Sequence, residues 1–179
     1  DPGQGMGIET ETVTAVQEAL EEGIFVIAAA GNTGAESSDV SVPANIQGVI
    51  AVGAYRSSGA IWGDSASGSN IDPYSGQPRE YPHQKPEIIA PGVNIFSTAS
   101  TELDPPYAYS SGTSDSTVFV TGALALILEE YGDAIAGEDG KIDLEEMSMV
   151  KRALANSANQ DPSSSGNHSS RLGYGSLNS

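Results

Sequence analysis

The 179-residue sequence contains no cysteine and only seven basic residues, and just 6% of it is aromatic. The absence of cysteine excludes disulfides, zinc–thiolate sites and thiol catalysis, but it does not fix the compartment. Seven basic residues against 24 acidic ones give a formal net charge of −17, which argues against nucleic-acid binding. Because no run of about eighteen apolar residues is present, we expect no membrane-spanning segment.

The acidic residues are spread along the chain, with denser patches at 9–22 and 129–146. A solvated acidic surface is the simplest interpretation of this pattern. Adaptation to high salt or to an extracellular, secreted setting is the alternative. The length predicts one domain, and a hydrophobic share of 38% can support a core.

The sequence Tyr-Ser-Ser-Gly-Thr-Ser at 109–114 is followed by an apolar run at 118–128. A run this long without a turn signal predicts a helix buried on nearly all sides. Ser114 would then stand where a loop enters the helix, and the free N–H groups there favour developing negative charge. The position suits a nucleophilic hydroxyl, although serine is also an ordinary N-cap.

A second apolar run, at 24–30, ends abruptly in Gly31 and Asn32. Strands that are apolar on both faces belong to parallel sheets covered by helices, and ligands bind beyond the carboxyl ends of such strands. Asn32 lies at that end, where its amide can donate a hydrogen bond to a developing oxyanion. A Gly-Asn pair that only holds a turn is the alternative.

Periodicity predicts the remaining elements. An apolar stripe from Val13 to Leu20 favours a helix that ends at Gly23, and the pattern at 144–154 favours an outer amphipathic helix. We expect strands 24–30, 49–54 and 93–97 to share one parallel sheet. The Ser-, Gly- and Pro-rich segment 55–84 is interpreted as a surface excursion, and 97–110 as a hairpin or loop that leads to Ser114.

These segments together resemble the subtilisin-like serine proteases, the subtilases. Ala-Ala-Ala-Gly-Asn at 28–32 resembles the oxyanion-hole motif of that family, and Gly-Thr-Ser at 112–114 resembles its nucleophile motif. Three further segments match in order, at 42–54, 85–93 and 173–178. The resemblance implies an α/β fold in three layers around a parallel sheet.

The resemblance also implies a site. Ser114 would be the nucleophile of an endopeptidase with polypeptide substrates and no organic cofactor. The Asn32 side chain and the Ser114 backbone N–H would hold the oxyanion. The pocket for the residue before the scissile bond would be lined by Ala28, Ala29, Ala30 and Gly31, with Ser41 near its base.

A weak cation site is implied in the same way. Ala44, Ile46 and Val49 correspond to backbone-carbonyl ligands in some subtilases, and Glu87 is near an acidic ligand. Such oxygens suit calcium or sodium, but turn hydrogen bonds alone would close the loop equally well. The segment 139–146 matches a calcium loop only in its second half, which favours a loop that caps an acidic helix start.

Two motifs of the family are missing from this sequence. Subtilases carry their triad in the order Asp, His, Ser, and the Asp and His motifs precede the oxyanion Asn. Neither motif occurs in the 31 residues before Asn32, and His83 and His168 lie in polar loops after it. We therefore expect residues 1–179 to form the C-terminal part of one catalytic domain, inactive alone and partnered by the N-terminal half.

The residues after Ser114 also differ from the family pattern. Asp115 to Gly122 read Asp-Ser-Thr-Val-Phe-Val-Thr-Gly, where subtilases usually have Met-Ala-Ser/Thr-Pro-His-Val-Ala-Gly. A carboxylate at Asp115 suits a helix N-terminus but raises the barrier to a nearby oxyanion. Two hypotheses therefore stay open: a serine endopeptidase, and a catalytically silent subtilase-like module used for binding or structure.

Overall fold

A computed structural model describes residues 10–159 and 168–178 of the chain. At its centre lies a parallel sheet of three strands, β1 (Ile27–Ala29), β2 (Ile50–Tyr55) and β3 (Ile88–Pro91), in the order β1-β2-β3. Ala28 pairs with Ala51, and Gly53 pairs with Ile89. The first five residues of β2 are buried, as a strand that is apolar on both faces predicts.

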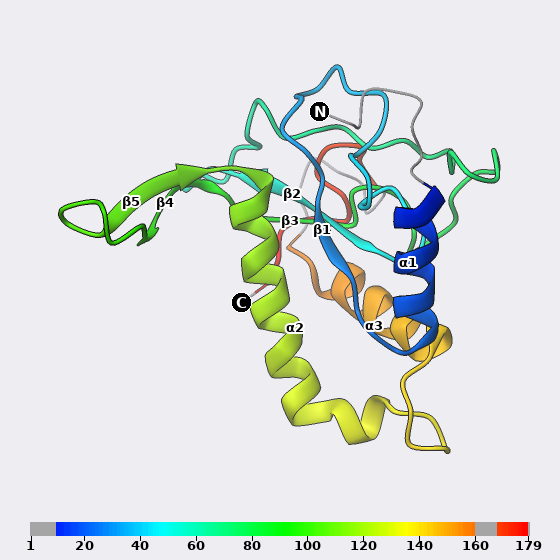
Figure 1. Cartoon of the computed structure of the whole chain (residues 1–179). Helices are drawn as coiled ribbons and strands as arrows, with labels where there is room; N and C mark the ends of the chain where they lie inside the picture. Colours follow the sequence, from blue (N-terminus) through cyan, green and yellow to red (C-terminus); the bar gives the residue numbers. More distant parts are fainter. Residues whose placement is uncertain (1–9, 160–167, 179) are drawn as a thin grey trace.

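Helices cover both faces of this sheet, which confirms the three-layer α/β architecture (Figure 1). Helix α1 (Thr10–Glu21) packs Val13 into a core cluster with Ala28, Val49 and Ala51. Helices α2 (Thr113–Ile135) and α3 (Leu144–Ser157) cover the other face, and their side chains form the second cluster with strand residues. That cluster includes Ile50, Val52, Ile88, Ala90, Val120, Leu124, Val150 and Leu154.

The helix boundaries follow from local sequence signals. Helix α1 is followed by Gly23, whose φ of +79° is the left-handed conformation that ends many helices. Helix α3 begins with a capping box, in which the Asp143 carboxylate accepts from Glu146 N–H and the Glu146 carboxylate accepts from Asp143 N–H. The segment 139–146 therefore caps an acidic helix start, as its sequence favours.

One strand prediction is wrong. Residues 93–97 belong to β4 (Val93–Thr98), which pairs antiparallel with β5 (Tyr107–Ser111) in a separate two-stranded hairpin. The third strand of the parallel sheet is β3, whose Ile88, Ile89 and Ala90 are buried. The chain leaves the sheet at Gly92, the hairpin projects away from the body of the molecule, and β5 returns to the start of α2 (Figure 1). The predicted hairpin at 97–110 is thus confirmed.

The prediction that α2 is buried nearly all round is also wrong. Its buried residues form one stripe, Thr113, Ser116, Val120 and Leu124. On the opposite face, Val118 is 70% exposed and Leu126 is 67% exposed. Within the described residues this apolar face has no protein cover, so the length of an apolar run did not reveal how many sides of the helix are packed.

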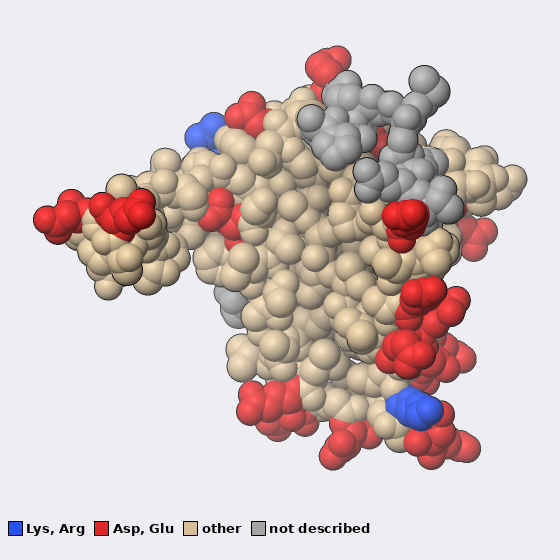
Figure 2. All heavy atoms as spheres, in the orientation of Figure 1, with Lys and Arg blue, Asp and Glu red and all other residues tan. Residues whose placement is uncertain are grey.

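The segment between Tyr55 and Ile88 has no named helix or strand among the described residues, but it is not purely a surface excursion. Ser65, Ala66, Arg79 and Lys85 are buried. Arg79, Lys85 and Lys151 are three of the seven basic residues, so the exposed surface is more strongly acidic than the composition suggests. Figure 2 shows this surface, with acidic side chains around the helix ends and at the hairpin tip.

None of the helices in the part of the chain that the structure describes is long and apolar enough to cross a membrane.

Candidate active site

Ser114 lies in the first turn of α2, directly after the hairpin strand β5 and Gly112. Its side chain is exposed, and its hydroxyl makes no hydrogen bond with any described residue. The prediction that Ser114 stands where a loop enters a helix is confirmed, since α2 begins at Thr113. Ser114 is therefore presented at the positive end of a helix of 23 residues.

Asn32 follows the carboxyl end of β1 and reaches the same helix start. Its Oδ1 accepts from the Thr113 backbone N–H at 3.0 Å and from the Thr113 hydroxyl at 2.9 Å. These two bonds fix the amide so that its nitrogen is left to donate elsewhere. If Gly112 were replaced by a residue with a side chain, its Cβ would lie 3.6 Å from Asn32 Nδ2 and 3.6 Å from the Ser114 backbone nitrogen. The two expected oxyanion donors therefore flank one point, although they come from residues that are 82 positions apart.

Thr113 connects the two segments and was not singled out from the sequence. It is fully buried, and its hydroxyl accepts from the Gly31 N–H at 3.1 Å while donating to Asn32. Its place in the Gly-Thr-Ser motif, next to Ser114, is the only signal for it in the sequence. Thr113 positions Asn32 relative to Ser114.

The residues expected to line the substrate pocket divide into two groups. Gly31 has φ +109°, and a Cβ there would lie 2.4 Å from Ser41 Oγ, so Ser41 packs directly against it. Ala28 and Ala30 place their side chains in the core cluster around Val49, and Ala29 is half-buried. Ala28 and Ala30 can therefore line a pocket only with backbone atoms.

Both histidines are engaged away from Ser114. His83 Nδ1 lies 3.1 Å from the Gln47 carbonyl and 3.1 Å from Lys151 Nζ, and burial together with that ammonium lowers its pKa to about 4. His168 Nε2 lies 2.9 Å from the Pro86 carbonyl, and burial lowers its pKa. Among the described residues neither ring contacts Ser114 by a hydrogen bond.

The residues expected to bind a cation surround two lysines instead. The Val49 carbonyl accepts from Lys85 Nζ at 2.5 Å and from Lys151 Nζ at 3.1 Å. Glu87 Oε1 lies 2.9 Å from Lys85 Nζ and 2.6 Å from Lys151 Nζ, and Oε2 accepts from the Ala51 N–H at 2.8 Å. We call Lys85, Glu87 and Lys151 the buried ion cluster.

The buried ion cluster argues against a metal ion at Val49 and Glu87. Burial lowers the pKa of Lys85 to about 7 and also lowers that of Lys151. Burial alone would raise the pKa of Glu87, but its ion pairs with both lysines outweigh this, and its pKa lies below the ordinary value. Two predicted ligands, Val49 and Glu87, thus already face positive charge, which disfavours a metal ion at that point. In residues 10–159 and 168–178, no group of three or more His, Asp or Glu side chains could hold a metal.

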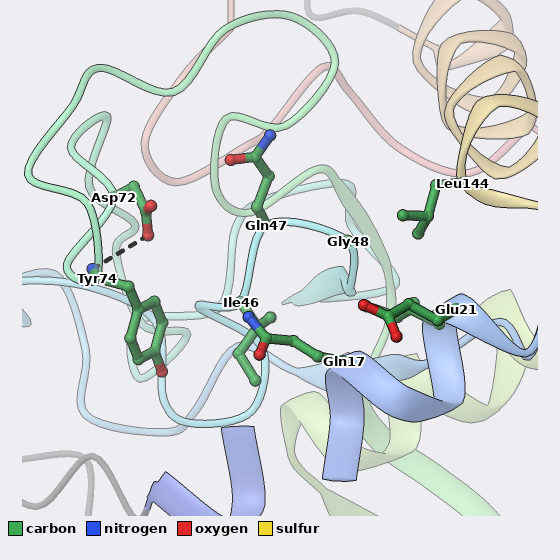
Figure 3. A pocket seen from close by; sticks show the side chains of 9 residues that line it. Gln17, Glu21, Ile46, Gln47, Gly48, Asp72, Tyr74 and Leu144 are labelled. Atoms are coloured by element: carbon green, nitrogen blue, oxygen red, sulfur yellow. Dashed lines mark hydrogen bonds between the residues drawn. The ribbon is translucent and has the colours of Figure 1, made fainter. Parts of the chain in front are cut away.

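The other two predicted ligands, Ala44 and Ile46, are buried in the adjoining loop, where the Ile46 N–H donates to the Pro43 carbonyl at 3.0 Å. Ile46 also borders a cavity of about 390 Å³ between α1, the 46–48 loop and Tyr74 (Figure 3). The Asp72 carboxylate at its edge accepts from the Tyr74 and Ser75 N–H groups. Ser114 and Asn32 do not line this cavity, so it is separate from the candidate active site.

Comparison with known proteins identifies relatives of this chain. The model of the subtilase family matches residues 3–175. Serine protease AprX of Bacillus subtilis (strain 168) is 35% identical over 141 residues, which cover 73% of this chain and 31% of AprX. Subtilisin amylosacchariticus of Bacillus subtilis subsp. amylosacchariticus is 39% identical over 124 residues, 68% of this chain and 28% of that protein.

Solved structures show the same fold over nearly the whole chain. The prenylagaramide maturation protease PagA superposes with a TM-score of 0.70 at 30% identity and covers 99% of this chain, which spans 55% of PagA. The patellamide maturation protease PatA gives a TM-score of 0.67 at 27% identity, with 99% of this chain and 56% of PatA covered. The chain thus spans about a third of the length of the curated relatives and about half of the solved ones.

Proposed function

Because this chain belongs to the subtilase family, we propose that it supplies the nucleophile and the oxyanion donors of a serine endopeptidase. The Asp and His of the triad would come from protein outside residues 1–179, namely the N-terminal part of the same catalytic domain. The observation that carries the proposal is the double hydrogen bond from Thr113 to Asn32 Oδ1 beside the exposed Ser114.

The proposed reaction uses this arrangement in two steps. The Ser114 oxygen attacks the carbonyl carbon of the scissile peptide bond while the histidine takes the hydroxyl proton. Asn32 Nδ2 and the Ser114 N–H donate to the oxyanion, and the intermediate collapses as the histidine returns the proton to the leaving amine. A water molecule then hydrolyses the acyl-enzyme and regenerates Ser114. Gly31 and Ser41 would contact the residue before the scissile bond. We place the enzyme outside the cell on the basis of its acidic composition.

The second candidate function is a catalytically silent module, and Asp115 is the observation that favours it. Its carboxylate adjoins Ser114, where negative charge opposes formation of an oxyanion. In that case the fold would serve binding or structure, and Ser114 would be an unreactive helix residue.

Labelling with a fluorophosphonate probe separates the two functions. We expect the 179-residue chain alone to be inert, because an isolated serine hydroxyl is a weak nucleophile without an adjacent base. The extended protein, meaning a version that also carries upstream Asp and His motifs of the subtilase type, should be labelled at Ser114, and Ser114→Ala should abolish the labelling. An unlabelled extended protein would support the silent module, and labelling of the chain alone would show that a base within it had been missed.

A further inference from the structure

The ammonium group of Lys151 is buried among acceptors from other parts of the chain, and the side chain that carries it is 2% exposed. Its Nζ lies 2.6 Å from Glu87 Oε1 and donates to the carbonyls of Gln47 at 2.9 Å and Val49 at 3.1 Å. His83 Nδ1 lies 3.1 Å from the same nitrogen. One positive charge on α3 thus joins the loop before β2 to the residue that precedes β3.

This set of acceptors suits an ammonium group and not a hard metal ion. Calcium takes roughly six to eight oxygen ligands at about 2.3–2.6 Å, whereas the contacts of Lys151 Nζ have the lengths of hydrogen bonds. The ring nitrogen of His83 can accept from an N–H group but is not a ligand that calcium prefers. The Ile46 carbonyl, another predicted ligand, accepts from the Val49 N–H at 3.1 Å, so a turn hydrogen bond closes this part of the loop.

Lys85 adds a second positive charge at the same acceptors. Its Nζ lies 2.5 Å from the Val49 carbonyl and 2.9 Å from Glu87 Oε1, and its side chain is fully buried. A divalent ion in the place of Lys151 Nζ would therefore share two acceptors with a lysine ammonium. The repulsion would be about twice that felt by a monovalent ion at the same distance.

We propose that Lys151 is the built-in cation of this site. Its ammonium takes the place of a bound metal ion and links α3 to the sheet, so the folded chain needs no metal there. This role does not depend on whether Ser114 is catalytic. When the side chain is cut back to alanine, the acceptors remain, and they should bind a small primary ammonium ion in preference to calcium.

The test is urea denaturation of the 179-residue chain carrying Lys151→Ala, with methylammonium chloride as the probe. Tetramethylammonium chloride at equal ionic strength is the reference, because it carries the same charge and screens the acidic surface equally but has no N–H donor. Methylammonium at ten times its Kd should raise the folded-to-unfolded ratio about tenfold, as one bound ion per chain provides. Tetramethylammonium should not.

Two variants serve as controls. Lys151→Met fills the space without a charge, so its midpoint should be the same in both salts. Arg152→Ala removes the same charge from the exposed neighbouring position and should also show no difference. If Lys151→Ala is unfolded without added ion, methylammonium should restore its helical circular-dichroism signal.

Three results would overturn the proposal. The first is an equal effect of the two ammonium salts on Lys151→Ala, including no effect of either. The second is stronger rescue of Lys151→Ala by calcium chloride than by methylammonium. The third is a fall in the wild-type midpoint when EDTA is added, which would show that the folded chain depends on a bound metal after all.

Discussion

Glu87 and Asp115 are two carboxylates of this molecule with opposite surroundings. Glu87 is 5% exposed and contacts two lysine ammonium groups and a backbone N–H. Asp115 is half-buried at the edge of a cavity, and among described residues only the Ser110 hydroxyl donates to it. The first carboxylate has its positive partners within the fold, whereas the second has one oxygen free to meet a partner from outside.

The difference shows how this chain uses its few basic residues. Lys85 and Lys151 lie inside the ion cluster, where they join the β2–β3 region to α3. A buried ion pair gives little net stability over an apolar replacement, but removal of one partner is costly because the other charge stays buried. Around Ser114 no described basic residue pairs with Asp115, so its negative charge is not compensated in this part of the fold.

The largest expected effect concerns the buried carboxylate of Glu87. Glu87→Gln should lower the free energy of unfolding by about 3–5 kcal/mol, because it leaves two ammonium groups without a buried counter-charge. Lys151→Met should cost less, because the Lys85–Glu87 pair remains and the cluster becomes neutral. Urea denaturation of the chain measures both, with the exposed Glu22→Gln as control. A greater loss from Lys151→Met would contradict this account of the cluster.

The next largest effect concerns Asn32 in the candidate active site. Asn32→Asp keeps an oxygen for the two Thr113 hydrogen bonds but removes the N–H donor and adds negative charge. In the extended protein kcat should fall at least about 10²- to 10³-fold, as expected for the loss of one oxyanion donor. Steady-state kinetics give the value, and Thr33→Ala at the exposed neighbouring position should leave kcat nearly unchanged. Retention of full kcat in Asn32→Asp would remove Asn32 from the site.

The smallest effect concerns pH. The folded chain holds the pKa of His83 at about 4, below its ordinary value of 6.5, through burial and the Lys151 ammonium, with Lys85 and Glu87 also nearby. Between these two pH values the unfolded chain binds more protons, so His83 should make the free energy of unfolding fall as the pH drops from about 6.5 to 4.

The measurement is urea denaturation at several pH values in that range. His83→Gln should weaken the dependence relative to the wild type, and Ser58→Ala, at an exposed position without a titratable group, should retain it. Equal slopes for the wild type and His83→Gln would show that His83 is equally protonated in the folded and unfolded states.

Much of the fold could be predicted because its signals are local. The apolar strand before Gly31-Asn32, the stripe of α1 and the helix start at Ser114 each depend on a few neighbouring residues. The prediction for strand 93–97 is wrong because apolar character continues from Ile88 past Gly92, and only the tertiary structure shows that the chain turns at Gly92. Solvent-exposed Phe96 fits an open ribbon rather than a covered sheet.

The buried ion cluster lay beyond sequence reasoning for a different reason. Lysine is ordinarily a surface residue, and Lys85 and Lys151 are 66 positions apart. No sequence pattern therefore indicates that both lysines pair with the Glu87 carboxylate. Sequence motifs suggest the roles of Ser114 and Asn32, but only the structure shows that Thr113 links the two residues. The structure brings these residues together at the start of α2.

The two edges of the parallel sheet are unequal. The outer side of β3 is occupied by the chain's last described segment, since the Ile89 N–H donates to the Gly175 carbonyl and the Leu177 N–H donates to the Ile89 carbonyl. Beyond β1 no strand is paired within the described residues. Within the described residues the sheet therefore has one free edge, which can take one further strand, and two copies that joined through it would cover each other's free edge. Pairing of this kind stops at a dimer, whereas a sheet with two free edges could extend into a fibre.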